Sequence, residues 1–233
     1  MAREQKRVQT IEPEAIDGQF EDFYGAVTRL LGRVPHFYRT ISNAPFLAML
    51  FLPINASAQR EWPGTRISGK IKEMVVIKTS HVNECEYCYA HNTSLGQAAG
   101  ITHEQIIEMS SDDYLTSNLF NEREKAAILW AENVTRNTAQ KNEDAYTRLK
   151  ANFSEGEIVE MTMLCGMFNM INRINDSLDV AIEAQPEIDK IQGSLHMDPA
   201  KMGEYLRWLG DNWPDEFETM NKQAEDAAAR FAR

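Results

Sequence analysis

Two cysteines three positions apart, Cys85 and Cys88, are the side chains in this sequence whose spacing points most clearly to chemistry. Residues three apart are neighbours on the surface of a helix, so these thiols can close a small disulfide or share a metal ion. A helix that begins at the pair would stabilise a thiolate through its N–H groups and dipole. A thiolate is the form of cysteine that attacks a peroxide oxygen or a disulfide sulfur. The dipole argument taken alone favours Cys85 as this thiolate.

Two further residues could move protons at the pair. His91 lies one helical turn beyond Cys88 and can reach its sulfur, whereas it points about 120° away from Cys85. As a proton acceptor, His91 could activate Cys88. Glu73 precedes the pair on a helix with an apolar run, where a carboxyl group would have a raised pKa and could pass a proton near neutrality. Structural roles stay open, namely a backbone-bonded histidine and a Glu73 ion pair or helix cap.

The segments around these residues have a helical pattern, and few runs of the chain alternate strictly between polar and apolar side chains. We expect helices over residues 68–82 and 84–99, with Asn83 as the N-cap of the second. The most apolar helix is expected over residues 158–180, where Cys165 should be buried and inert. The sequence therefore predicts an all-α fold.

Capping boxes mark the starts of two further helices and of the apolar helix over residues 158–180. They are Thr102 with Gln105, Asn121 with Glu124, and Ser154 with Glu157. Residues 71–75 resemble residues 158–162 in sequence, and we call this similarity the internal echo. The same offset aligns Cys85 and Cys88 with Asn172 and Asn175. If the echo is a true repeat, it implies pseudo-twofold symmetry within one domain over residues 1–233.

Composition limits the classes of partner. The chain has 233 residues, 43% of them hydrophobic, and a formal net charge of −11. This charge argues against nonspecific binding to nucleic acid or to an anionic membrane. No apolar run is long enough for a membrane span and no secretory leader is evident, so we expect a cytoplasmic protein. In that reducing compartment, a close cysteine pair points to catalysis or metal binding.

The order Glu73, Asn83-x-Cys85-x-x-Cys88 and His91 resembles the core signature of the AhpD-like, or carboxymuconolactone decarboxylase-like, superfamily, in its peroxidase-related branch. The resemblance covers about residues 20–185, which leaves a helical C-terminal extension over about residues 198–233. It implies an AhpD-like helical bundle that assembles as a homo-oligomer.

The resemblance also implies an activity, the reduction of a peroxide substrate by the cysteine pair, which a dithiol reductant protein then recycles. In this scheme Cys88 attacks the peroxide, Cys85 resolves the intermediate, and His91 and Glu73 relay protons. No metal or organic cofactor is required. Two departures concern the relay. The usual histidine position, four residues after the second cysteine, holds Asn92, and Tyr87 stands where the founding enzymes have histidine.

Two other functions stay open from the residues. Cys85 and Cys88 with His91 or His103 could supply ligands to Zn²⁺ in a metal-binding module. Alternatively, Glu73 and His91 could act as acid and base in a lyase or isomerase on the same scaffold. The superfamily's lactone decarboxylases lack the paired cysteines, which counts against this last activity.

Overall fold

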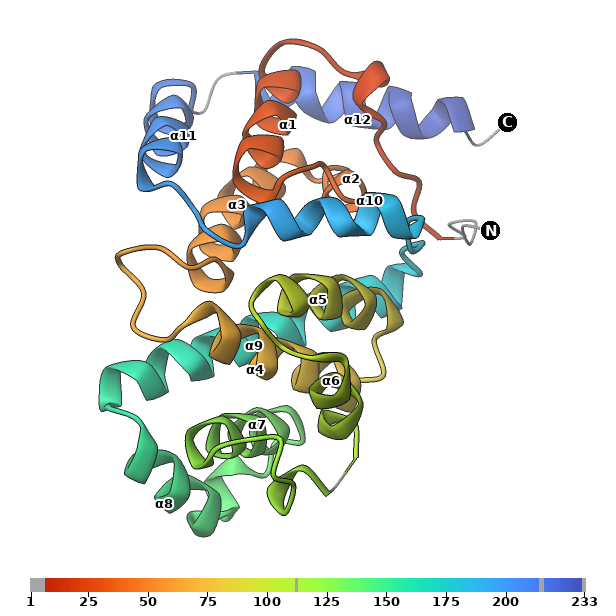
Figure 1. Ribbon diagram of the computed structural model, residues 1–233. Helices are drawn as coiled ribbons and strands as arrows, with labels where there is room; N and C mark the ends of the chain where they lie inside the picture. Colours follow the sequence, from red (N-terminus) through yellow and green to blue (C-terminus); the bar gives the residue numbers. More distant parts are fainter. Residues whose placement is uncertain (1–6, 112, 214–215, 232–233) are drawn as a thin grey trace. The chain divides into compact units, whose positions relative to one another are not determined.

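The computed structural model describes residues 7–111, 113–213 and 216–231 (Figure 1). Their regular elements are all helical. They contain no strand, and one isolated bridge joins Glu61 to His196. The expected all-α fold is therefore confirmed. The chain divides into two compact units, one formed by Met1–Pro63 with Leu178–Arg233 and the other by Gly64–Ser177. The prediction of one domain stays a prediction.

The unit formed by Gly64–Ser177 contains both cysteines of the pair. Its elements are α4 (Gly69–Val82), α5 (Glu86–Ala98), α6 (His103–Met109), η2 (Asp113–Leu115), α7 (Glu122–Thr135), η3 (Ala139–Lys141), α8 (Glu143–Asn152) and α9 (Glu155–Leu178).

Helix α4 forms the core of this unit. It packs against α5 and α7, and its residues are buried without a break from Ile71 to Ser80. Because α4 has neighbours on more than one side, it is buried, as its apolar run predicted. Ser68 caps its start by accepting a hydrogen bond from the backbone N–H of Ile71.

The three expected capping boxes are present, at the starts of α6, α7 and α9. In each box the capping side chain accepts a backbone N–H and the third helical residue bonds back to the cap. The repeat inferred from the internal echo stays a prediction. The residues that it aligns with Cys85 and Cys88 lie within the continuous helix α9 and do not follow a turn between two helices.

The start of α5 differs from the expectation. Asn83 ends α4 as its C-cap and does not begin the next helix. Glu84 follows with a φ of 58°, in the left-handed region, which cannot continue a right-handed helix. Helix α5 therefore begins at Glu86, with Cys85 as its N-cap.

The other unit holds η1 (Pro13–Ala15), α1 (Gly18–Leu31), α2 (His36–Ile41), α3 (Pro45–Gln59), α10 (Gln185–Asp189), η4 (Lys190–Ser194), α11 (Pro199–Asp211) and α12 (Phe217–Phe231). The last two helices fall in the expected C-terminal extension. Contacts of α11 with α1 and of α12 with α3 join this extension to the N-terminal helices.

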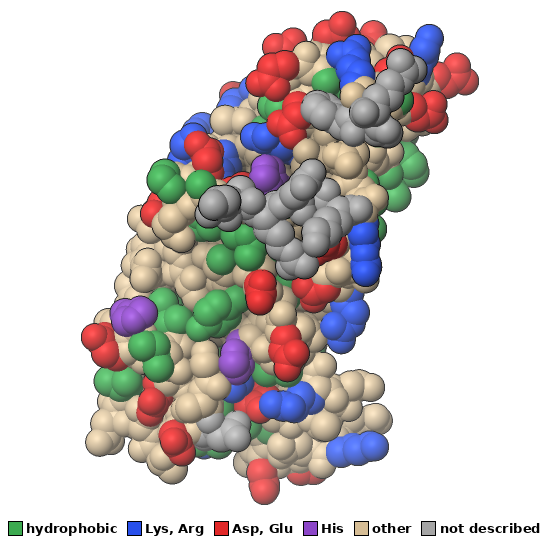
Figure 2. Space-filling model, turned by 90° about the vertical axis from the view of Figure 1, so that its right-hand side faces the viewer, with side chains coloured by type: hydrophobic (Ala, Val, Ile, Leu, Met, Phe, Trp, Pro, Cys, Tyr) green, Lys and Arg blue, Asp and Glu red, His purple; other side chains and the backbone are tan. Residues whose placement is uncertain are grey.

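None of the helices within the described ranges combines the length and the apolar character needed to cross a membrane. On the face drawn in Figure 2, acidic side chains are spread among basic and apolar ones. This distribution agrees with the net charge of −11.

Candidate active site at the start of helix α5

Cys85 and Cys88 are held by the tight connection between α4 and α5. The backbone N–H of Cys85 donates to the carbonyl of Ser80 at 3.0 Å, which closes the turn. The left-handed Glu84 makes this turn possible, at the energetic cost that such a conformation has for a residue with a side chain. As N-cap and third helical residue, the two sulfurs lie at the amino end of α5. The helix dipole there favours negative charge.

Both cysteines are reduced and buried, with 1% of Cys85 and 3% of Cys88 exposed. The Cys85 thiol hydrogen-bonds to Cys88, and this bond is the main reason why the pKa of Cys85 is raised, followed by burial. Cys85 thus holds its proton and can donate it toward the Cys88 sulfur. The raised pKa disfavours a thiolate on Cys85, contrary to the dipole argument taken alone.

Helix α9 supplies a second donor to the same sulfur. The Nδ2 atom of Asn175 lies 3.2 Å from the Sγ atom of Cys88, within hydrogen-bonding distance. Asn175 is 2% exposed. Its Oδ1 atom is also buried, and it accepts no hydrogen bond within the described part of the chain. One side chain therefore presents a donor to the sulfur and an unfilled acceptor beside it.

Asp176, the next residue of α9, lies beside the other sulfur. The single proton of the Cys85 thiol can be donated to the Asp176 carboxylate as an alternative to the Cys88 sulfur. Loss of hydration raises the pKa of Asp176, while the bond from Cys85 and the charge of Arg173 oppose this rise. Since Asp176 is also exposed at the surface, it connects the Cys85 proton to solvent.

A cluster of amide side chains fixes α9 against the turn between α4 and α5. The Asn83 side chain donates to the Oδ1 atoms of Asn169 and Asn172, at 3.0 and 2.8 Å. Arg173 donates to the carbonyl oxygen of the same Asn83 side chain at 3.1 Å. These bonds set the rotation of α9 and so place its next turn, which carries Asn175, beside the thiols.

His91 is held in one tautomer by its own helix. Its Nδ1 atom lies 2.7 Å from the backbone carbonyl of Tyr87, which can only accept, so Nδ1 carries the proton. The Nε2 atom of the neutral ring is then a proton acceptor. The His91 ring also stacks on Tyr87, with ring centroids 4.1 Å apart. The backbone bond is the contact expected for a structural histidine, and it also orients the ring as a base.

Glu73 is completely buried on α4. It faces α5 at Gly96, where an added Cβ would lie 3.6 Å from the Cβ of Glu73 and 2.8 Å from Cδ1 of Ile77. Glycine thus allows the two helices to approach closely at this level. The roles expected for Glu73 and His91 in proton transfer stay predictions.

The third cysteine is separate from this pair. Cys165 is fully buried on α9, lies 3.2 Å from the Thr79 hydroxyl, and has a pKa raised by burial. These surroundings agree with the expected inert cysteine. Within the ranges that the structure describes, no group of three or more His, Cys, Asp and Glu side chains is arranged to hold a metal ion.

Sequence reasoning assigned no role to Asn175 or Asp176. The available signal was the polar spacing of Asn169, Asn172 and Asn175 along an otherwise apolar helix, which marks a polar stripe on its inner face. The internal echo also set Asn175 against Cys88, and these are the two residues whose side chains meet.

Several known proteins resemble this chain in sequence or in fold. Residues 54–133 match the model of the carboxymuconolactone decarboxylase family. A solved structure from Agrobacterium tumefaciens, a putative antioxidant defence protein AhpD, is 25% identical, with a TM-score of 0.51 over 60% of this chain and 91% of that one.

Two further solved structures share the fold. An uncharacterized peroxidase-related protein with an alkylhydroperoxidase AhpD core, from Ralstonia eutropha, is 18% identical, with a TM-score of 0.67 over 84% of this chain and 100% of that one. The debrominase Bmp8 is 24% identical, with a TM-score of 0.61 over 79% of this chain and 96% of that one.

Proposed function

We propose that the chain is a dithiol oxidoreductase of the AhpD-like superfamily and that it reduces hydroperoxides with Cys88 and Cys85, which the family match and the likeness to a putative AhpD protein support. The observation that carries this proposal is the contact of two reduced thiols at the start of α5, with the amide donor of Asn175 on Cys88.

Peroxide reduction begins at Cys88. The Cys88 thiolate attacks the terminal oxygen of ROOH, the O–O bond breaks, and the alkoxide takes a proton to leave as ROH. Sulfur is oxidised to a sulfenic acid. Hydrogen bonds from the Cys85 thiol and the Asn175 amide stabilise the thiolate before attack, and the unfilled Oδ1 atom of Asn175 can accept the hydrogen of the bound hydroperoxide.

Cys85 then resolves the intermediate. Its sulfur attacks the sulfenic sulfur of Cys88, a disulfide forms, and the hydroxyl group leaves as water with the proton from Cys85. Asp176 is placed to carry that proton from the Cys85 thiol to the leaving hydroxyl group, since its carboxylate can accept a hydrogen bond from Cys85. A dithiol reductant protein returns the pair to two thiols by exchange, and its own thiols become a disulfide.

His91 and Glu73 complete the proposed site. With its proton fixed on Nδ1, His91 offers Nε2 as a base that can take the Cys88 proton. Glu73 is the carboxyl group on the face of α4 toward α5, where it can exchange a proton with this relay.

The test is consumption of tert-butyl hydroperoxide with an added dithiol reductant. We expect Cys88→Ser to abolish turnover, and Cys85→Ser to allow one turnover that leaves Cys88 as a sulfenic acid, detected by a dimedone adduct. Cys165→Ser is the matched control, and it should turn over like the parent chain. Glu73→Gln and His91→Gln should each slow the reaction by about a hundredfold.

Full turnover in both Cys85→Ser and Cys88→Ser would exclude the dithiol mechanism. An activity on a different substrate class that survives the double substitution would instead favour the lyase or isomerase hypothesis, in which Glu73 and His91 act without sulfur.

A further inference from the structure

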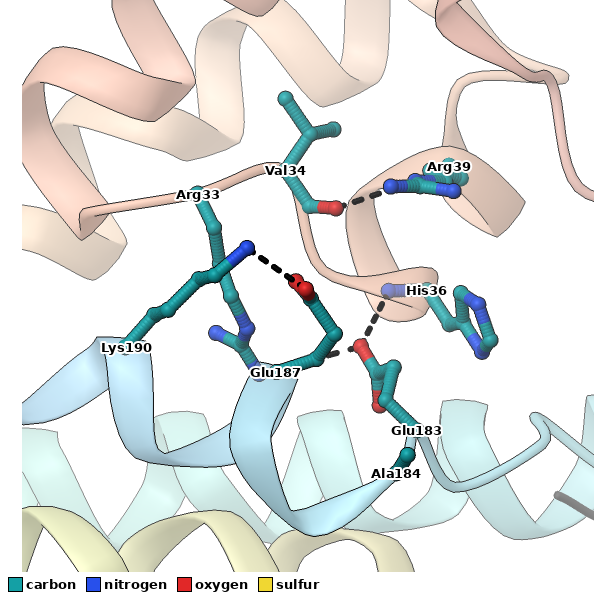
Figure 3. A pocket seen from close by; sticks show the side chains of 8 residues that line it. All are labelled: Arg33, Val34, His36, Arg39, Glu183, Ala184, Glu187 and Lys190. Atoms are coloured by element: carbon teal, nitrogen blue, oxygen red, sulfur yellow. Dashed lines mark hydrogen bonds and ion pairs between the residues drawn. The ribbon is translucent and has the colours of Figure 1, made fainter. Parts of the chain in front are cut away.

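A separate cavity lies in the unit formed by Met1–Pro63 and Leu178–Arg233. Its volume is about 540 Å³, within the range typical of small-molecule sites. Figure 3 shows its lining, which comes from the loop after α1, from α2, and from the segment leading into α10 and η4. The lining residues are Arg33, Val34, His36, Arg39, Glu183, Ala184, Glu187 and Lys190.

Arg33 is the central feature of this cavity. Its side chain is only 7% exposed, yet its Nε and Nη2 atoms are buried and find no hydrogen-bond acceptor among the residues that the structure describes. Glu183 balances its charge, but the closest oxygen lies 3.7 Å from Nη2, too far for a hydrogen bond. Nε–H and Nη2–H form one edge of the guanidinium group, the edge that binds a carboxylate through two parallel hydrogen bonds.

The nearer carboxylate oxygen of Glu183 makes its hydrogen bond to the backbone and not to this edge. Its Oε1 atom accepts the backbone N–H of His36 at 2.7 Å, which holds the carboxylate at the start of α2. The loop itself is fixed by Gly32, whose φ is 83° and where an added Cβ would lie 2.9 Å from the carbonyl oxygen of Lys190. The two segments are therefore in close contact at the position where Arg33 enters the cavity.

The charges of the lining limit the class of ligand. Arg39 is already paired with Glu12 at 2.6 Å, and the remaining basic residues, Arg33 and Lys190, are matched in number by Glu183 and Glu187, so the lining has no excess positive charge. Lys190 pairs with Glu187 at 2.5 Å, but both side chains are about half exposed, 54% and 49%, so this pair is weak and can open. The ligand class is therefore indicated by the unfilled Arg33 edge, which fits the two oxygens of one carboxylate, and a lining with no excess positive charge disfavours a dianion such as phosphate.

From these observations we propose that the cavity binds a small monocarboxylate, held by two hydrogen bonds from Nε and Nη2 of Arg33. The ammonium group of Lys190 adds a third contact to the carboxylate, and Val34 and Ala184 provide apolar surface for a short aliphatic chain. The ligand supplies the two acceptors that the buried guanidinium edge lacks.

The test is a titration with sodium butyrate, followed by the ¹⁵N–¹H resonance of Arg33 Nε. Butyramide has the same shape without the charge, and inorganic phosphate tests selectivity. We expect saturable binding of butyrate, a downfield shift of the Nε–H signal, and binding of butyramide and phosphate weaker by about tenfold or more. An equal response to butyramide, or no saturable shift with butyrate, would overturn the proposal.

Four variants, each checked for folding by circular dichroism, locate the site. Arg33→Lys keeps the charge but removes the two-donor edge, and should weaken butyrate binding by about tenfold or more. Lys190→Gln should weaken it about two- to threefold, whereas Glu187→Gln should strengthen it by a similar factor because it removes the competing carboxylate. Arg29→Lys, on the exposed end of α1, is the matched control and should bind like the parent chain.

Arg33→Lys with unchanged affinity would contradict the proposal. If that variant does not fold, the opposite effects of Lys190→Gln and Glu187→Gln decide the matter, because these two half-exposed side chains lie at the surface. Failure of both to change the affinity would place butyrate outside this cavity.

Discussion

At the scale of single residues, the different roles that we propose for the two sulfurs depend on side chains from another helix. Cys85 donates toward Cys88, while Asn175 contacts Cys88 and Asp176 contacts Cys85. The sequence predicted the pair and its proton relay from spacing alone. It could not predict the two α9 residues, because their distance from the sulfurs is set by tertiary packing.

Asn175→Ala should make Cys88 a poorer nucleophile. A hydrogen bond to a charged group contributes about 1.5–3 kcal/mol, so its loss should slow alkylation of Cys88 about ten- to one-hundredfold at neutral pH. The measurement is the rate of carbamidomethylation of Cys88 by peptide mapping across a pH series. Asn152→Ala on α8, whose amide donates to Arg148, is the control. Equal rates in both variants would remove Asn175 from the site.

Asp176 should make stability depend on pH in a defined direction. Its pKa is raised in the folded protein, whereas in the unfolded chain it ionises near pH 4, at about 3.9. Between these two values the folded state binds more protons, so the free energy of unfolding falls as pH rises through this window.

Asp176→Asn should therefore flatten that part of the stability profile and increase stability at neutral pH relative to the parent chain. Urea denaturation at successive pH values measures this, with Asp226→Asn on the exposed face of α12 as control. A slope that is unchanged by Asp176→Asn would contradict the raised pKa.

At the scale of elements, caps and apolar runs predicted most helices, but the start of helix α5 was predicted wrongly. Asn83 has the right side chain for an N-cap, yet its amide is bound to Asn169 and Asn172 of α9 and it ends α4. Long-range contacts thus overrode a local preference. They force Glu84 into the left-handed region, which local sequence rules assign to glycine.

Glu84→Gly should relieve this backbone strain while it preserves the turn. We expect the free energy of unfolding to rise by up to about 1 kcal/mol, with the reactivity of Cys88 retained. Chemical denaturation monitored by circular dichroism measures the change. Glu86→Gly, two residues later in the first turn of α5, should instead lower the free energy of unfolding by about 1 kcal/mol. Destabilisation by Glu84→Gly would show that the Glu84 side chain has a stabilising role.

At the scale of the whole molecule, the fold class was predictable because helical periodicity extends through nearly all of the chain. The division into two compact units was not, since both ends of the chain contribute to one of them. The expected homo-oligomer stays a prediction. Exposed apolar side chains on α9, namely Val159, Met163 and Met170, are 57%, 68% and 45% exposed and would suit a subunit interface.

Met163→Glu should therefore lower the mass of the assembly, measured by size-exclusion chromatography with light scattering. The control is Tyr146→Glu, at an exposed position on α8. A monomeric parent chain would contradict the homo-oligomer, and an assembly that is insensitive to Met163→Glu would place its interface elsewhere.

The central claim is that Cys85 and Cys88 form a peroxide-oxidisable pair. Intact mass spectrometry after one equivalent of tert-butyl hydroperoxide, over a range of pH, tests it most directly. We predict the loss of two hydrogen atoms per chain, mapped to a disulfide between Cys85 and Cys88, with Cys165 left as a thiol. An unchanged mass, with both thiols slow to alkylate, would contradict the account.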